Sequence, residues 1–127
     1  MTTIKVVCGI IRKDSKIFIA RRKPHLSQGG CWEFPGGKLE PNEDPMEGLR
    51  RELLEELDLV VANPVYLAEH RHDYDSFTIH LIAYECDFVS SSFTLTDHDT
   101  WAFVQPDELP KYPICGADQF FVAQLTK

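Results

Sequence analysis

Residues 36–59 read GGKLEPNEDPMEGLRRELLEELDL, and this stretch predicts a loop, a helix and a second loop. Asp44 suits the N-cap position, Pro45 suits the first helical position, and Glu47 completes a D-x-x-E capping box. Beyond this cap, apolar residues recur at steps of three and four, as on the core-facing stripe of a helix: Met46, Leu49, Leu53 and Leu57. The pattern therefore predicts an amphipathic helix that begins at Pro45.

A second face of the same helix carries three acidic residues: Glu52, Glu55 and Glu56. Like charges at these spacings repel each other, and an acidic helix face is usually just solvated. Two neighbouring features favour a ligand site instead. The pair Gly36-Gly37 allows close approach of the backbone to a ligand, and Arg51 is placed to pair with Glu55 or Glu47. A cluster of carboxylate oxygens suits a hard cation such as Mg²⁺, and such cations accompany phosphates.

The spacing of this stretch resembles the signature of the Nudix hydrolases, G-x5-E-x7-R-E-U-x-E-E-x-G-U, in which U is a bulky aliphatic residue. Gly37, Glu43 and residues 51–59 match every fixed position except the last glycine, where this chain has Asp58. Because Asp tolerates left-handed backbone better than most non-glycine residues, the departure predicts altered turn strain rather than a lost site. The preceding residues 32–36, WEFPG, are similar to the MutT-type branch of the family.

The resemblance implies an α+β fold, the Nudix α/β/α sandwich, with a mixed β-sheet, the helix of the signature and a C-terminal helix. It also implies a divalent cation, Mg²⁺ with Mn²⁺ as the alternative, held by oxygen ligands: the Gly36 carbonyl, Glu52, Glu55, Glu56 and Asp97. The family often takes a further carboxylate from a later loop, and counting back from Trp101 selects Asp97 over Asp99. Glu52 is either a ligand or the base that orients water, Arg51 belongs to the same catalytic group, and Glu43 has a supporting role.

The resemblance further implies the residues that contact the substrate: Arg22, Phe34, Gly37, Lys38, Tyr74 and Asp118. Arg22 and Tyr74 correspond in position to residues that line the nucleotide pocket of MutT-type enzymes. The alternative for Arg22 is a solvated strand end, and the alternative for Tyr74 is a residue at the tip of a hairpin. Phe34 is either a core residue or a wall on which the base stacks.

Asp118 lies in residues 112–118, YPICGAD, which resemble the stretch of MutT-type enzymes that touches the edge of the base. The alternative is an acidic residue at a helix N-terminus, where the helix dipole favours it. An ionised carboxylate accepts hydrogen bonds only, so Asp118 would favour the N–H donors of cytosine, adenine, guanine or 8-oxoguanine. An acceptor left opposite O4 of uracil or thymine would cost about 1–3 kcal/mol.

Outside the signature, apolar patterns and turn residues predict seven strands, over residues 4–11, 16–22, 31–34, 65–71, 76–88, 90–95 and 101–104. Residues 60–64 are expected to form a connection, residues 106–109 one turn of helix, and residues 117–125 a final helix. Strands, a helix, more strands and a short terminal helix make an α+β fold with a mixed sheet between helices.

Composition sets the remaining expectations. A chain of 127 residues, 1–127, suffices for one domain, and the net charge of −7 without a basic run disfavours a nucleic-acid polymer as partner. The sequence has neither a membrane-spanning run nor a secretory signal, so we expect no membrane partner and a cytoplasmic location, as a monomer or homodimer. The cysteines lack a C-x-x-C motif and are expected to be reduced, mostly buried thiols, with zinc binding or disulfides as alternatives: Cys8, Cys31, Cys86 and Cys115.

The sequence thus predicts an enzyme that hydrolyses a nucleoside triphosphate to a nucleoside monophosphate and diphosphate with Mg²⁺, for example one that removes oxidised nucleotides such as 8-oxo-dGTP. A pyrimidine triphosphate such as CTP or dCTP is an alternative substrate, and another nucleoside diphosphate derivative is a further one. A non-catalytic nucleotide sensor is the alternative of a different class. Because all the acidic residues of the helix are present, the enzyme is favoured.

Overall fold

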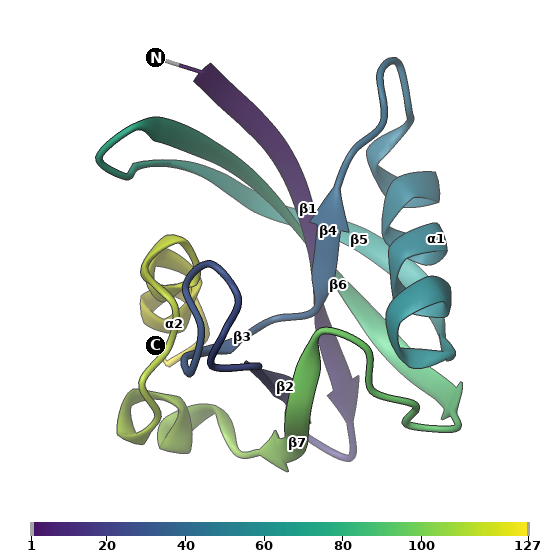
Figure 1. Ribbon diagram of the computed structural model, residues 1–127. Helices are drawn as coiled ribbons and strands as arrows, with labels where there is room; N and C mark the ends of the chain where they lie inside the picture. Colours follow the sequence, from purple (N-terminus) through teal and green to yellow (C-terminus); the bar gives the residue numbers. More distant parts are fainter. Residues whose placement is uncertain (1, 127) are drawn as a thin grey trace.

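A mixed β-sheet of seven strands forms the centre of the computed structural model, which describes residues 2–126 (Figure 1). The strands are β1 (Thr2–Lys13), β2 (Lys16–Arg22), β3 (Trp32–Glu33), β4 (Gly36–Lys38), β5 (Leu59–Asp73), β6 (Phe77–Ser91) and β7 (His98–Val104). The same residues form the α-helices α1 (Pro45–Leu57) and α2 (Gln119–Leu125) and the short 3₁₀ helices η1 (Pro106–Lys111) and η2 (Gly116–Asp118). None of these helices is long and apolar enough to cross a membrane.

Strand β1 organises the sheet because both of its edges are used. One edge pairs in parallel with β6, from Thr2 opposite Phe77 to Arg12 opposite Asp87. The other edge is shared by two antiparallel strands at different levels, since β4 pairs with residues 6–8 and β2 with residues 12–13. β5 continues the sheet beyond β6, and β3 and β7 both pair with β2. β2 and β4 therefore leave β1 at different points along its length.

Alternating side chains of the buried strands supply a core on each face of the sheet. Cys8 and Ile10 of β1 belong to one cluster, which includes Phe121 of α2. Val7 and Ile11 belong to the other, which includes three leucines of α1: Leu49, Leu53 and Leu57. α1 thus covers one face and the C-terminal helical segment covers the other (Figure 1). This is the α+β fold with a mixed sheet between helices that the sequence predicts.

The ends of α1 follow from its sequence. The carboxylate of Asp44 caps the helix by accepting hydrogen bonds from the backbone N–H groups of Met46 and Glu47, at 3.1 and 3.2 Å. Asp58 ends the helix in the left-handed region, with φ 50° and ψ 39°, and its N–H donates to the carbonyls of Leu53 and Leu54. The residue that departs from the signature glycine therefore adopts the conformation that a glycine would favour.

Two of the expected connections belong to strands instead. Residues 36–38 were expected in a loop, but they form β4 because their backbone pairs with residues 6–8 of β1. Residues 60–64 were expected to connect α1 to a strand beginning at Val65, but β5 begins at Leu59. An irregularity between Ala62 and Val65, with Asn63 at φ 53°, lets Pro64 sit in the strand without breaking the pairing with β6.

The strand expected over residues 90–95 is wrong. Residues 90 and 91 end β6, and residues 92–95 form no strand. The hydroxyl of Ser91 donates to the carbonyl of Leu57 at 2.8 Å and accepts from the N–H of Phe93 at 2.9 Å. Phe93 has φ 56°, so the chain turns here toward the end of α1 instead of continuing as a strand.

Candidate active site

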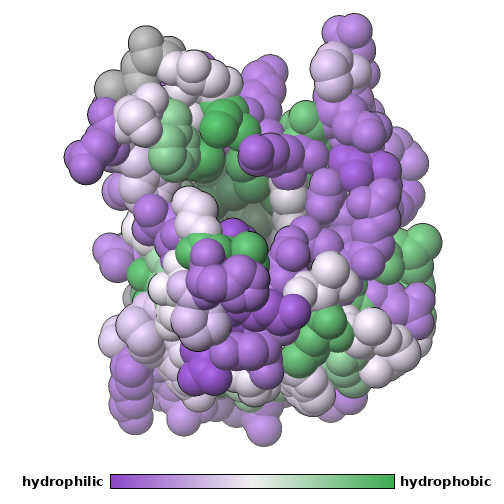
Figure 2. Space-filling view, in the orientation of Figure 1, coloured by the Kyte–Doolittle hydropathy of each residue, from purple (hydrophilic) through white to green (hydrophobic). Residues whose placement is uncertain are grey.

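A cavity of about 620 Å³ opens beside the point where β2 and β4 diverge (Figure 2). Its lining comes from β1, β4 and α1 on one side and from β2, β3 and the segment around η2 on the other. Figure 2 shows a hollow with hydrophobic residues at its floor and many hydrophilic residues around its rim. The cavity is open to solvent and is walled by both polar and apolar groups, as expected of a small-molecule site.

Five acidic residues line the cavity, and three of them are ligands that the sequence predicts for the cation: Glu52, Glu56 and Asp97. Glu52 and Glu56 lie one turn apart on α1, and Asp97 directly precedes β7. Burial, and then the charge of Asp97, raises the pKa of Glu56 to about 9, and two further carboxylates add to this effect. The competing candidate, Asp99, is turned away and pairs with Arg21 at 2.8 Å.

The chemistry of these groups fits a hard divalent cation. Burial is the first cause of the raised pKa of Glu56 and the neighbouring carboxylates add to it, and a bound cation would relieve the repulsion among these acids. Within residues 2–126, no group of three or more His, Cys, Asp or Glu side chains forms a ready-made metal site. The structure therefore supplies oxygen donors for a cation without a closed ligand set.

Arg51 holds several of the signature acids together. Its Nε and NH2 atoms donate to the two carboxylate oxygens of Glu43, at 2.7 and 2.9 Å. Its NH1 atom donates to Glu52 at 3.0 Å and to Glu55 at 3.2 Å. The hydrogen bonds from Arg51 lower the pKa of Glu43 to about 2. The expected pair with Glu55 is thus present, whereas the alternative pair with Glu47 is wrong, because Glu47 lies beside Arg50.

Glu43 and Glu55 differ in position from the acids of the cavity. Neither side chain lines the cavity, and the side chain of Glu55 is 60% exposed. Glu43 is 13% exposed and held at both oxygens by Arg51, which fits its predicted supporting role.

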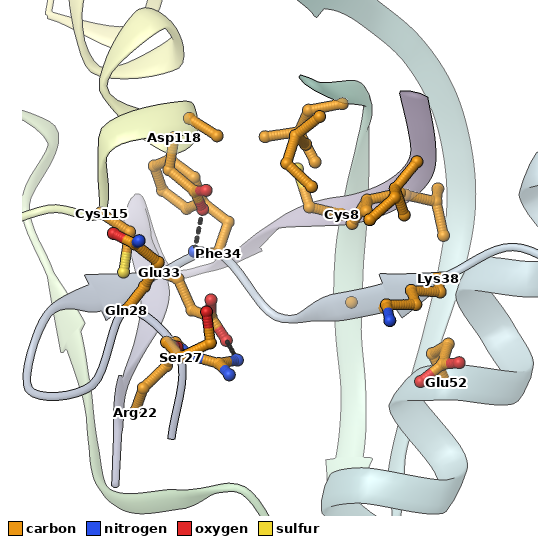
Figure 3. A pocket seen from close by; sticks show the side chains of 18 of the residues that line it. Cys8, Arg22, Ser27, Gln28, Glu33, Phe34, Lys38, Glu52, Cys115 and Asp118 are labelled. Carbon is orange, nitrogen blue, oxygen red and sulfur yellow. Dashed lines mark hydrogen bonds and ion pairs between the residues drawn. The ribbon is translucent and has the colours of Figure 1, made fainter. Parts of the chain in front are cut away.

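A Cβ atom at either glycine of β4 would meet neighbouring atoms of the protein. A Cβ atom on Gly36 would collide with the carbonyl oxygen of Val7, and one on Gly37 would collide with the carboxylate of Glu52. Position 36 therefore requires glycine because the clash is with the backbone of β1, whereas a side chain at position 37 would displace the Glu52 carboxylate from its place. Both glycines and Lys38 line the cavity, and Figure 3 shows Lys38 beside Glu52.

The opposite wall carries the other residues that the sequence selects for the substrate. Arg22, Phe34 and Tyr74 all line the cavity. Phe34 is only 2% exposed and belongs to the core as well as to the cavity wall, so the core reading is confirmed and the stacking of a base on Phe34 stays a prediction. The hydroxyl of Tyr74 accepts from the N–H of Ala117 at 3.1 Å, which fixes the ring against the start of the C-terminal helical segment.

Asp118 is a buried wall residue rather than a solvated helix cap. It is 7% exposed, lines the cavity, and accepts a hydrogen bond from the backbone N–H of Phe34 at 2.8 Å (Figure 3). Its side chain makes no capping hydrogen bond to α2. Burial, and then the charge of Glu33, raises the pKa of Asp118 well above its usual range. Burial thus favours the neutral form of Asp118 more than it would for an exposed carboxylate, an effect that the sequence alone does not indicate.

Sequence reasoning missed Glu33 and His98. Glu33 lines the cavity, and its Oε2 atom lies 2.8 Å from Nε2 of His98 and 3.4 Å from NH1 of Arg22. His98 is completely buried. The available signal was an acidic residue between Trp32 and Phe34 in a short apolar strand, where a buried charge needs a partner.

Two of the four cysteines are not free thiols. Cys31 and Cys115 form a disulfide, whereas Cys8 and Cys86 are free and buried, so the expectation of four reduced cysteines is wrong for one pair. The bridge joins the residue before β3 to a residue of the cavity wall. It reinforces the hydrogen bond from the N–H of Cys115 to the carbonyl of Trp32, at 2.8 Å. The segment that carries Asp118 is thereby held against β3.

Comparisons with known proteins find relatives that match most of the chain. Residues 6–124 match the model of the NUDIX domain family. The chain is 36% identical over 118 residues to the CTP pyrophosphohydrolase of Escherichia coli (strain K12). The matched region covers 93% of this chain and 87% of that protein. It is 43% identical over 72 residues to the 8-oxo-dGTP diphosphatase of Proteus vulgaris, and this match covers 56% of this chain and 64% of that protein. The crystal structure of a MutT NUDIX hydrolase from Burkholderia pseudomallei has the same fold, with a TM-score of 0.87, 23% identity and 98% of each chain covered.

Proposed function

This chain belongs to the Nudix hydrolase family, and we propose that it hydrolyses a nucleoside triphosphate to a nucleoside monophosphate and diphosphate, with Mg²⁺ as cofactor and Mn²⁺ as the alternative. Proteins of this family act on small nucleotide substrates and generally use divalent metal ions. The observation that carries the proposal is one cavity with acidic side chains on the α1 side and Arg22, Tyr74 and Asp118 on the other. This arrangement suits a molecule with phosphates at one end and a base at the other.

In this proposal the cation is held by oxygen ligands from α1, β4 and the loop before β7: Gly36, Glu52, Glu55, Glu56 and Asp97. A bound divalent cation supplies two effects, since it neutralises charge on phosphoryl oxygens and lowers the pKa of the attacking water. Glu52 is either one of the ligands or the base that orients this water, and Arg51 fixes its orientation through the 3.0 Å hydrogen bond. Gly37 and Lys38 contact the phosphates from β4.

The base is proposed to lie between Phe34, Tyr74, Arg22 and Asp118. We propose 8-oxo-dGTP and cytosine nucleotides as the best substrates, in line with the names of the two curated relatives. An ionised Asp118 accepts from the N–H donors of these bases, whereas a neutral Asp118 can also donate to a carbonyl. Because burial raises the pKa of Asp118, rejection of UTP and dTTP should be weaker than for a permanent carboxylate and should grow as pH rises.

The decisive experiment is a hydrolysis panel with Mg²⁺ that identifies the products for 8-oxo-dGTP, dGTP, CTP, dCTP, UTP, dTTP and a nucleotide sugar. Release of diphosphate from a triphosphate supports the proposal, and hydrolysis of the nucleotide sugar alone would refute it. Glu56→Gln should lower kcat by roughly two decades or more, as for loss of an electrostatic stabiliser. A Glu56→Gln protein with a near-native rate would exclude the proposed metal site.

The role of Asp118 has its own test. Asp118→Asn provides a permanent N–H donor at nearly the same volume, so it should narrow the gap in kcat/KM between cytosine and uracil nucleotides, most of all at high pH. The metal dependence should stay unchanged. Asp99→Asn makes the same chemical change outside the cavity and serves as the control. An unchanged ranking of bases in Asp118→Asn would leave Asp118 with a structural role only.

A further inference from the structure

Glu33 is held in place from two sides by residues that the sheet brings together. In the pairing of β2 with β7, Arg22 lies opposite His98, and in the pairing of β2 with β3, Ala20 lies opposite Glu33. The same oxygen of Glu33, Oε2, contacts the ring of His98 at 2.8 Å and the guanidinium of Arg22 at 3.4 Å. Arg22 is anchored in turn, because its Nε donates to the carbonyl of Ser27 at 2.9 Å.

The side chain of His98 makes its hydrogen bond to Glu33. The ring is completely buried and does not line the cavity, so it is not placed to touch a ligand. Its Nδ1 atom is buried and has no hydrogen-bond partner within residues 2–126. An ionised carboxylate only accepts, and toward such a partner Nε2 is the ring nitrogen that carries the hydrogen. A buried histidine with this single polar contact acts on the site through the carboxylate that it holds.

Glu33 lines the cavity and is connected through neighbouring residues to groups at both of its ends. The next residue along the chain, Phe34, donates its N–H to Asp118, and the residue that binds Glu33, His98, directly follows Asp97. The charge of Glu33 acts on both ends, since it contributes to the raised pKa of Asp118 and to that of Glu56. Figure 3 shows Glu33 and Arg22 across the cavity from Lys38 and Glu52.

A nucleotide bound as proposed above would bring its sugar toward Glu33. Its base would lie toward Asp118 and its phosphates toward Glu52 and Glu56, so the sugar would come between them. Sugar hydroxyls are donors, and a carboxylate fixed by two other groups is a pre-organised acceptor. We propose that Glu33 accepts a hydrogen bond from a sugar hydroxyl of the nucleotide, and that His98 is the positioning residue that holds Glu33 for this contact.

This inference rests on the proposed nucleotide site, and it makes Glu33 a determinant of sugar selectivity. The hydroxyl in question is the 2′ or the 3′ group. One hydrogen bond to a charged acceptor corresponds to roughly a ten- to hundredfold difference in affinity. The nucleotide that lacks this one hydroxyl should therefore bind the wild-type protein more weakly by that factor, whereas the nucleotide that lacks the other hydroxyl should not.

The test measures the binding of nucleoside monophosphates by calorimetry, in a buffer that contains a metal chelator, so that the result does not depend on turnover. The probes are CMP, 2′-deoxy-CMP and 3′-deoxy-CMP, and the three corresponding guanosine monophosphates. The sugar contrast is the ratio of the dissociation constants of the nucleotides without and with the recognised hydroxyl. Glu33→Ala and His98→Leu should reduce this contrast to about threefold or less. His98→Gln keeps an N–H donor of similar reach and should retain most of the contrast. If His98→Leu does not fold, Glu33→Ala and His98→Gln still test the proposed roles of Glu33 and His98.

His80 offers a matched control, since its Nε2 contacts Glu69 and its Nδ1 is likewise buried without a partner among the described residues. This second His–Glu pair lies on the β5–β6 hairpin, and neither residue lines the cavity. His80→Leu should therefore keep the full sugar contrast.

A kinetic measurement separates positioning from a general loss of structure. With the triphosphate that is turned over best, His98→Leu should raise KM for the sugar with the recognised hydroxyl and leave kcat within a few-fold. A sugar contrast that persists in Glu33→Ala, or that is absent from the wild type for both bases, overturns the proposal. A contrast in binding without any hydrolysis would instead reject the proposed activity alone.

Discussion

Replacing Glu56 with Gln should change how the stability of the metal-free protein depends on pH. In the folded protein the pKa of Glu56 is raised from 4.5 to about 9, first by burial and then by the charge of Asp97. The folded state therefore binds a proton that the unfolded state releases between these two values. The stability linked to this group is fully present below pH 4.5 and is lost as pH rises to about 9.

The magnitude follows from the same two values. Each pH unit between them costs about 1.4 kcal/mol, so the full interval corresponds to at most about 6 kcal/mol. Glu56 keeps partial contact with solvent, and we expect about half of this in practice. Gln has nearly the same volume and no charge to bury. As pH rises from 5 to 9, the free energy of unfolding of Glu56→Gln should therefore increase by about 3 kcal/mol relative to that of the wild type.

The assay is urea unfolding in a chelator at several pH values, with Glu47→Gln as the control that removes the same charge from an exposed position of α1 outside the proposed metal site. Added Mg²⁺ should stabilise the wild type more at pH 9 than at pH 6, because the cation binds the ionised carboxylate. Glu56→Gln should respond less to Mg²⁺. Parallel stability curves for the wild type and Glu56→Gln would refute the electrostatic reasoning for this wall of the cavity.

Three further predictions concern other parts of the chain. Asp97→Asn should lower kcat with Mg²⁺ more than tenfold whereas Asp99→Asn should change it less than threefold, and equal small effects would remove the loop from the site. Asp58→Gly should raise the free energy of unfolding by about 1 kcal/mol and Asp58→Ala should lower it, because of the left-handed backbone at this position. Replacing both Cys31 and Cys115 with Ser should cost about 2–5 kcal/mol, since the bridge spans 84 residues; an unchanged urea midpoint would contradict this.

The sequence predicted α1 and its caps because these depend on local chemistry. Asp44, Pro45 and the apolar stripe act within a few residues of each other, and the carboxylates follow the same helical repeat. The fixed spacing of the signature also predicted Glu52 and Glu56, and resemblance predicted Asp97, as neighbours of one cavity. The sequence did not predict that Glu55 would remain exposed, because the tilt of a helix against a sheet is set by packing.

Other features of the site were decided only by tertiary structure. Glu33 and His98 are 65 residues apart, and Phe34 and Asp118 are 84 apart, so no local pattern relates them. The raised pKa of Asp118 depends on burial, which the sequence does not state for an acidic residue. The sequence thus determined which helix carries the acids and which face they share, because that information is local. The pairing of β2 with β3 and β7 brought Glu33, Arg22 and His98 together beside the cavity, because strand register joins residues that are remote along the chain.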